Sequence, residues 1–392
     1  MSIFDEIINR KGTYCTQWDY VRDRFGIDDV LPFSISDMDF KAPVEVIEDL
    51  KNRVEHGIFG YSRWNHDDYK NSVLNWYKSR FNYDLNKDWI IYVPSVIYAI
   101  NKIFEVVGEK DDKVLFLTPA YDNFFKSLSS SKRDFITSHL VIENNNFVIN
   151  WQDFENKLKE VKFFLFCNPH NPTGRVWTET ELEQIIILCK KYNVIIVSDD
   201  IHMDIVYKPA KFIPILEVAE KQDYTDNTII VTSGSKSFNT PSLGGAYCLI
   251  PNFEIYKKLM SKVKEQDSLG SPMILGILAL MSSYNKCAYW IDDLLDYLYN
   301  NLLITQKFLK ENYKDIDLIM PQGTYLAWIN LSKLNLSMNE IQERLVNIGQ
   351  VGIMRGDIYG EEKNYLRLNV ACSTVKLQDG LIRFKKSFTD IN

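Results

Sequence analysis

The chain has 392 residues, of which 46% are hydrophobic and 25% are charged, and its formal net charge is −7. This composition is typical of a folded globular protein, and the negative charge argues against a nucleic-acid partner. The six cysteines include no C-x-x-C pair, so we expect neither a disulfide framework nor a metal site, and free thiols are typical of a cytoplasmic protein. The first residues lack an apolar core and no run of about eighteen apolar residues exists, so we expect neither a signal peptide nor a membrane span.

Short apolar runs alternate with longer amphipathic segments through the middle of the chain. The runs cover residues 114–117, 163–166, 194–197, 229–232 and 247–250. Near-continuous apolar runs of this length are typical of strands buried on both faces, as in a parallel sheet. The clearest helical pattern spans residues 178–192, where Thr178 and Glu181 stand at the positions of a capping box. The alternation predicts an α/β fold with a mostly parallel sheet and crossover helices.

The final third of the chain has a different pattern. A long helix is expected over residues 288–312, half-buried strands over 325–330 and 365–370, and a last helix over 374–387. We therefore expect residues 46–285 to form a large α/β domain and residues 286–392 a smaller α+β domain. Residues 1–45 are expected to form an N-terminal arm that joins the small domain.

Three polar segments follow the predicted central strands, at the sheet edge where open α/β folds bind ligands. Asn171 lies in a loop with two Asn-Pro steps, which alone could be purely structural. Asp199 ends a buried strand, where it could pair with a cationic ring nitrogen or cap a helix. Lys236 lies between serines in a Gly-containing turn, and a lone lysine is most often a surface residue.

A metal-ligand reading of the second segment is also open. Asp199, Asp200, His202 and Asp204 carry suitable donor atoms, but no further His or carboxylate cluster has metal spacing. The order of Asn171, Asp199 and Lys236 along successive strands instead matches what pyridoxal 5′-phosphate (PLP) requires. This cofactor needs a lysine for covalent attachment, an acid at its pyridine nitrogen and donors at its phenolic oxygen and phosphate.

The chain resembles the fold-type I PLP enzymes of the class I/II aminotransferase group over nearly its whole length. The motifs that carry the resemblance are DMDFKAP at residues 37–43, GY at 60–61, TPAY at 118–121, NPHNPTGRVW at 168–177, DDIHMD at 199–204, SGSKSFN at 233–239 and RLN at 367–369. The 169–177 segment and the His-Met-Asp run after Asp199 are typical of the MalY/PatB branch of cystathionine β-lyase-like C–S lyases.

The resemblance implies roles around the cofactor ring. Lys236 is placed like the lysine that holds PLP and moves the proton at the substrate Cα, and Asp199 like the partner of the pyridine nitrogen. Asn171 and His202 resemble the groups that hydrogen-bond the phenolic oxygen, and Asn171 also resembles a substrate contact. Tyr121 resembles the aromatic that stacks on the ring; a core aromatic at a helix start is the alternative.

The resemblance also implies contacts to the phosphate and the substrate. Ser95 and Val96 match the turn at a helix N-terminus that binds the phosphate, and Ser233 and Ser235 would add hydroxyl groups. Tyr61 resembles the residue that reaches the phosphate and substrate from a neighbouring subunit, which implies a homodimer with shared sites.

Arg367 matches the arginine that binds the substrate α-carboxylate, a small amino acid being the expected substrate. A surface arginine at a strand edge is the alternative for this position.

The reaction that the resemblance implies is α,β-elimination of an S-substituted cysteine to a thiol, pyruvate and ammonia. Class I/II aminotransferase activity is the alternative, and a regulatory binding role is a third. Classical aminotransferases carry an arginine eight residues after the lysine, where this chain has Gly244. Other departures are Ser95 where glycine is usual, Asp200 where glutamate is usual, and the segment 240–245.

Overall fold

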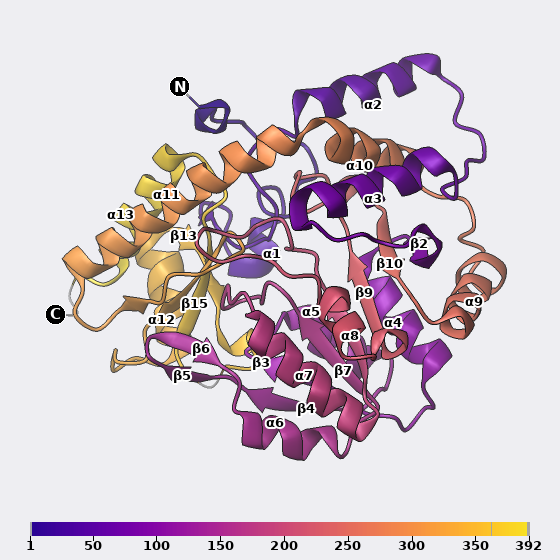
Figure 1. Cartoon of the computed structure of the whole chain (residues 1–392). Coiled ribbons are helices and arrows are strands. Elements are labelled where there is room, and N and C mark those ends of the chain that lie inside the picture. Colours follow the sequence, from indigo (N-terminus) through magenta and orange to yellow (C-terminus); the bar gives the residue numbers. More distant parts are fainter. Residues whose placement is uncertain (1, 362, 390–392) are drawn as a thin grey trace.

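The computed structural model describes residues 2–361 and 363–389 and is built around a central seven-stranded sheet (Figure 1). Its order is β2-β10-β9-β8-β7-β3-β4. The strands are β2 (Ile90–Val93), β3 (Val114–Thr118), β4 (Phe135–His139), β7 (Phe163–Cys167), β8 (Ile195–Asp199), β9 (Thr228–Thr232) and β10 (Ala246–Leu249). Strands β4, β3, β7, β8 and β9 run parallel, whereas β10 is antiparallel to both β9 and β2. The expected mostly parallel sheet is therefore confirmed.

Helices pack around this sheet, and several of them fill the connections between its strands (Figure 1). They are α2 (Val44–His56), α3 (Asp67–Phe81), α4 (Val96–Val107), α5 (Asp122–Ser130), α6 (Trp151–Leu158), α7 (Glu179–Tyr192), α8 (Ile215–Lys221), α9 (Phe253–Ser261) and α10 (Ile274–Lys286). Helix α4 packs against β2, β9 and β10, and α8 packs against β9. Helices on the sheet remove its strands from water, which explains why the runs are apolar throughout rather than alternating.

Helix α7 shows how closely local sequence specifies an element here. Thr178 accepts a hydrogen bond from the Glu181 N–H, and the Glu181 carboxylate accepts one from the Thr178 N–H, so the expected capping box is formed. Asn193 closes the helix in the left-handed conformation. The apolar face is buried, as expected; it consists of Leu182, Ile185, Ile186 and Cys189.

The C-terminal third forms a second unit beside the sheet (Figure 1). Its elements are α11 (Ala288–Asn312), α12 (Met338–Glu343), α13 (Thr374–Ser387) and a four-stranded antiparallel sheet of β11 (Asp317–Leu318), β12 (Leu326–Asn330), β15 (Tyr365–Asn369) and β14 (Met354–Arg355). The helices and strands expected in this third are confirmed, but β12 and β15 are buried along almost their whole length, so the expectation that these strands are half-buried is wrong.

The N-terminal segment joins this second unit. It contains α1 (Val21–Phe25) and β1 (Leu31–Pro32), and β1 pairs in parallel with β13 (Val351–Gly352). The remaining pair, β5 (Val141–Glu143) and β6 (Asn146–Val148), forms a hairpin. Because the N-terminal segment pairs with the C-terminal third, we propose the division into an arm of residues 1–45, a large domain of 46–285 and a small domain of 286–392.

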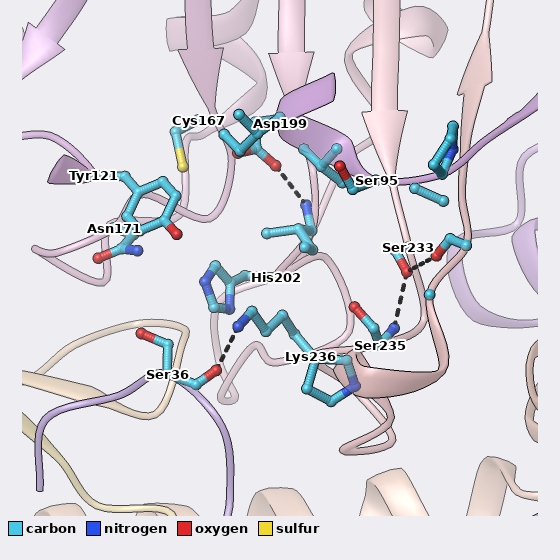
Figure 2. Close-up of a pocket in the computed structure, with 18 residues that line it drawn as sticks. Ser36, Ser95, Tyr121, Cys167, Asn171, Asp199, His202, Ser233, Ser235 and Lys236 are labelled. Atoms are coloured by element: carbon cyan, nitrogen blue, oxygen red, sulfur yellow. Dashed lines mark hydrogen bonds between the residues drawn. The ribbon is translucent and has the colours of Figure 1, made fainter. Parts of the chain in front are cut away.

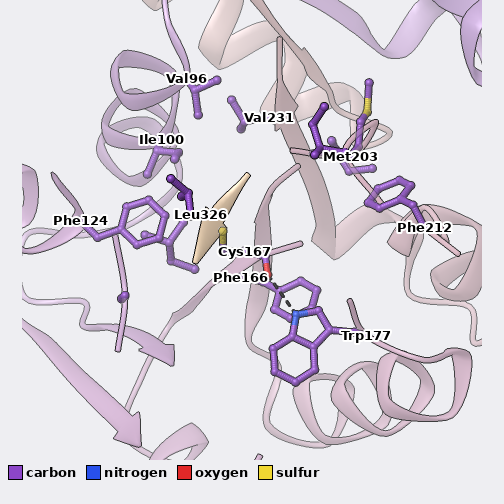
Figure 3. Packing of buried hydrophobic residues seen from close by; sticks show 14 of the residues in the cluster. Val96, Ile100, Phe124, Phe166, Cys167, Trp177, Met203, Phe212, Val231 and Leu326 are labelled. Atoms are coloured by element: carbon purple, nitrogen blue, oxygen red, sulfur yellow. Dashed lines mark hydrogen bonds between the residues drawn. The ribbon is translucent and has the colours of Figure 1, made fainter. Parts of the chain in front are cut away.

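Buried hydrophobic side chains from α4, α5, β7 and β9 and from the loop after β7 belong to one core (Figure 3). The buried Trp177 donates a hydrogen bond from Nε1 to the carbonyl oxygen of Cys167 at 3.0 Å, which closes the loop that follows β7. Arg175 in the same loop donates to the carbonyl of Phe147 and to the side chain of Gln322. The loop that carries Asn171 is thus held at both ends.

The segment 33–40, which belongs to the N-terminal part of the chain, passes along the same edge of the sheet. The Asn239 amide accepts from the Met38 N–H and donates to the carbonyl of Phe40. Asp39 is buried and pairs with Lys376 and Arg10 at 2.5 and 2.8 Å. These contacts place the backbone of residues 34–37 directly beside the turn that carries Lys236.

No helix in the described part of the chain is both long and apolar enough to cross a membrane.

Candidate active site

A cavity of about 200 Å³ opens at the carboxyl ends of β7, β8 and β9, and the predicted site residues gather around it (Figure 2). The expected residues that line it are Ser95, Val96, Tyr121, Asn171, Asp199, His202, Ser233, Ser235 and Lys236. These residues are far apart in the sequence. They meet because the parallel strands end at one edge, so each loop that follows a strand opens on the same space.

Lys236 is the cation of this cavity, and Figure 2 shows its amine between His202 and Ser36. Its Nζ donates a hydrogen bond to the carbonyl oxygen of Ser36 at 2.5 Å. Loss of hydration lowers the pKa of Lys236 to about 8, while the nearby Asp37 opposes this shift and Arg367 adds to it. A larger fraction of this amine is therefore neutral near pH 7 than in an ordinary lysine.

Asp199 is the last residue of β8, and only 4% of its surface is exposed. Its Oδ1 accepts the N–H of Ile201 at 3.2 Å, and a turn rather than a helix follows, so the helix-cap alternative is wrong. Burial raises the pKa of Asp199 to about 7, against the opposing effects of the Ile201 N–H and of Lys236. Burial also raises the pKa of the neighbouring Asp200, to which Ser198 donates a hydrogen bond.

His202 and Asn171 face the cavity from the two loops that follow β8 and β7. Burial, with smaller contributions from Lys236 and Arg367, lowers the pKa of His202 to about 3, so the imidazole is neutral near pH 7. Its Nδ1 is buried and has no hydrogen-bond partner among the described residues. Asn171 Oδ1 accepts a hydrogen bond from Arg367 Nη1 at 3.1 Å.

Arg367 does not line the cavity but lies against it through Asn171. It is part of β15, is 4% exposed, and donates from Nη2 to the carbonyl of Ser34 at 3.1 Å. The alternative of an exposed strand-edge arginine is therefore wrong. Its Nε is buried without a partner among the described residues, so the protein does not saturate the hydrogen-bonding capacity of this guanidinium.

The other end of the cavity is formed by the start of α4 and the turn after β9. Ser95 caps α4 by accepting the Tyr98 N–H at 3.3 Å, and its φ of −157° is extended backbone. Glycine is not required there, so the departure at position 95 does not disturb the geometry. The free N–H groups of the first helical turn are the usual donors to a phosphate.

At this end of the cavity, Ser233 and Ser235 already form hydrogen bonds to neighbouring residues of the protein. Ser233 donates from Oγ to the Gly245 carbonyl at 2.8 Å and accepts the Ser235 N–H at 3.2 Å. Gly244 has a φ of +70°, and a Cβ there would lie 2.2 Å from the sulfur of Met273. Met273 can move away, but the left-handed backbone is strained for any residue other than glycine, so this conformation disfavours the arginine that classical aminotransferases carry at this position.

Tyr61 is the one expected residue that stands apart. Its side chain is fully exposed and does not line the cavity of its own chain. A role toward a neighbouring subunit stays a prediction.

Sequence reasoning missed Ser36 and Cys167, which also line the cavity. Ser36 acts through its backbone carbonyl, which also accepts a hydrogen bond from Tyr325 at 2.9 Å. A backbone contact between residues 200 positions apart leaves no mark in a sequence pattern. Among the described residues, no group of three or more His, Cys, Asp or Glu side chains could hold a metal ion.

A model of the family "aminotransferase class I and II" matches residues 28–384. The chain belongs to this family. It is 39% identical to protein MalY of Escherichia coli (strain K12) over 96% of both chains, and 31% identical to cystathionine beta-lyase PatB of Bacillus subtilis (strain 168) over 98% of this chain and 100% of that protein. The structure of cystalysin from Treponema denticola, which contains PLP, superimposes with a TM-score of 0.94 at 29% identity, covering 99% of each chain.

The cofactor of this family is PLP, and the fold is the fold-type I arrangement of its members. The residues around the cavity fit this cofactor. Asp199 is a buried carboxylate that forms no ion pair within the described part of the chain, which suits a cationic ring nitrogen, and Lys236 supplies a weakly basic amine. The unpaired Nδ1 of His202 and the N-terminus of α4 leave donors for oxygen atoms of the cofactor.

The raised pKa of Asp199 predicts how the cofactor-free protein depends on pH. Between about pH 4 and pH 7 the folded state retains a proton that the unfolded chain has released, so stability falls as pH rises. Asp199→Asn cannot titrate, and its unfolding free energy should fall less steeply, by up to about 1.4 kcal/mol per pH unit in this window. Urea unfolding at pH 4.5, 5.5 and 6.5 measures the two slopes.

The exposed Asp379 offers the matched control, and Asp379→Asn should keep the wild-type slope. Equal slopes for the wild type and Asp199→Asn would show that Asp199 titrates like a hydrated carboxylate.

Proposed function

We propose that the chain is a PLP-dependent C–S β-lyase that converts S-substituted L-cysteines, cystathionine among them, to a thiol, pyruvate and ammonia. The observation that carries the proposal is the end-to-end match with a protein named cystathionine beta-lyase. The geometry supports the first chemical step, because a weakly basic amine and a buried carboxylate face one cavity. Loss of the Cα proton is common to both reactions considered for this chain.

Lys236 is the base in this proposal. Its lowered pKa leaves neutral amine available near neutral pH, whereas His202, with a pKa of about 3, takes up a proton only under acidic conditions. PLP, when bound, accepts the electron pair that the leaving Cα proton releases. Asp199 would keep the ring nitrogen protonated, and the neutral His202 and Asn171 would hydrogen-bond the phenolic oxygen.

The remaining residues bind and orient. Arg367 would bind the substrate carboxylate with the Nε that has no partner, while Tyr121 would cover one face of the ring. These two contacts would orient the substrate so that its Cα–H bond faces Lys236. Departure of the thiolate from Cβ completes the elimination, and water then yields pyruvate and ammonia.

Transamination is the second candidate, and the family to which the chain belongs is named for it. It differs in the carbon atom that receives the proton. Gly244 argues against a classical aminotransferase, because the arginine of those enzymes is missing and the φ of +70° is a backbone conformation that a residue with a side chain rarely adopts. The lyase is therefore the function that we propose.

An assay of the holoenzyme with cystathionine and no keto acid separates the two reactions. We expect pyruvate, ammonia and homocysteine in equal amounts, because elimination needs no second substrate. Turnover that begins only when a keto acid is added would contradict the lyase and support transamination. Lys236→Ala is the control and should lower turnover by at least about 10³-fold, since it removes the base.

We further propose that the active enzyme is a homodimer with shared sites. The segment 58–61 and the adjoining α2 carry exposed apolar side chains, and an exposed apolar surface of this kind is typical of a protein–protein interface. They are Val44, Ile47, Val54, Ile58, Phe59 and Tyr61. A second copy that covers this surface would bring the exposed Tyr61 to the cavity of its partner.

Mixed dimers test the shared site. Lys236→Ala and Tyr61→Ala subunits, each of low activity alone, should regain about a quarter of wild-type activity when co-expressed with different tags, because half of the dimers are mixed and each holds one intact site. Mass photometry of the same samples gives the oligomeric state. Activity no higher than the mean of the two parent dimers would contradict a shared site.

A further inference from the structure

Arg367 is held without an anionic partner. Its guanidinium donates to two neutral oxygen atoms, of Asn171 and Ser34, and no ion pair to it is formed within the described residues. A buried cation without an anion is costly, and it needs another source of stabilisation when no substrate is bound. The ring of Tyr359 supplies one, because its centroid lies 4.6 Å from Arg367 Cζ.

The ring of Tyr359 is fully buried and held from several sides. Trp328 packs against it edge to face, with centroids 5.5 Å apart and planes at 87°. Trp328 also lies directly opposite Arg367 in the β12–β15 register. The ring therefore packs against β12, and the arginine lies on β15, the strand paired with it.

The backbone of Tyr359 also contacts the segment that carries Tyr121, which lines the cavity. Its carbonyl oxygen accepts the N–H of Ala120 at 2.8 Å, one residue before Tyr121. Gly360 follows at a φ of +76°, and a Cβ there would lie 2.7 Å from the ring of Phe125. The turn that holds Tyr359 thus has little freedom, and it fixes the arginine relative to Tyr121.

We propose that Tyr359 is a positioning residue for substrate binding, whose aromatic face orients Arg367 toward the substrate α-carboxylate. The ring rather than the hydroxyl carries this role, because the hydroxyl is buried and has no hydrogen-bond partner among the described residues. The inference rests on the proposed function only in that the ligand is an α-amino acid. It requires neither elimination nor transamination.

The test uses binding of L-alanine and L-alaninamide, which differ in the carboxylate charge, to the holoenzyme by absorbance titration. Tyr359→Leu should weaken L-alanine binding about tenfold and leave L-alaninamide binding unchanged, because only the carboxylate contacts the arginine. Tyr359→Phe keeps the ring and should bind both ligands as the wild type does.

Two results would overturn the proposal. One is equal weakening of both ligands in Tyr359→Leu, which indicates a general structural defect; the other is a loss in Tyr359→Phe as large as in Tyr359→Leu, which assigns the role to the hydroxyl. If Tyr359→Leu does not fold, Tyr359→Met replaces it, because methionine has a volume similar to that of leucine and also lacks an aromatic ring. Neither result bears on the cystathionine assay, so failure here and failure of the lyase proposal are distinguishable.

Discussion

The constraint on which the site depends is the removal of unpaired charges from water. Asp199 and Arg367 are almost fully buried, Lys236 lines the same cavity as Asp199, and no ion pair joins these three side chains. An unpaired buried charge costs several kcal/mol. The protein tolerates this cost because the core beneath the strand ends is tightly packed and the loops are held by hydrogen bonds such as that of Trp177.

The same constraint sets the chemistry. Each charged group is held by weak neutral partners: Asp199 by one backbone N–H, Lys236 by one carbonyl, and Arg367 by two carbonyl-type oxygens. The pKa shifts of Asp199 to about 7 and of Lys236 to about 8 follow from this poor hydration. A cofactor with a cationic ring nitrogen and a substrate with a carboxylate would provide the missing opposite charges, so binding and stabilisation of the site are coupled.

Sequence patterns predicted the part of the site that depends on strand ends. The apolar runs before Asn171, Asp199 and Lys236 fixed their strands, and parallel strands bring their following loops together. Patterns could not reveal the carbonyl of Ser36, because a backbone atom carries no residue preference. The same holds for Tyr359, whose contact with Arg367 exists only once β14 and β15 are in place. The extended φ of Ser95 also required the structure, since a glycine-to-serine departure alone suggests strain that is absent.

The assignment of Lys236 as the covalent anchor of PLP underlies every other role proposed for the site, and borohydride reduction tests it directly. Reduction of the purified holoenzyme, followed by proteolysis and mass spectrometry, should find the reduced cofactor on the peptide that contains Lys236 and on no other lysine. Lys236→Ala treated in the same way should carry none. Reduced cofactor on a different lysine, or an unchanged amount in Lys236→Ala, would contradict the assignment of the site.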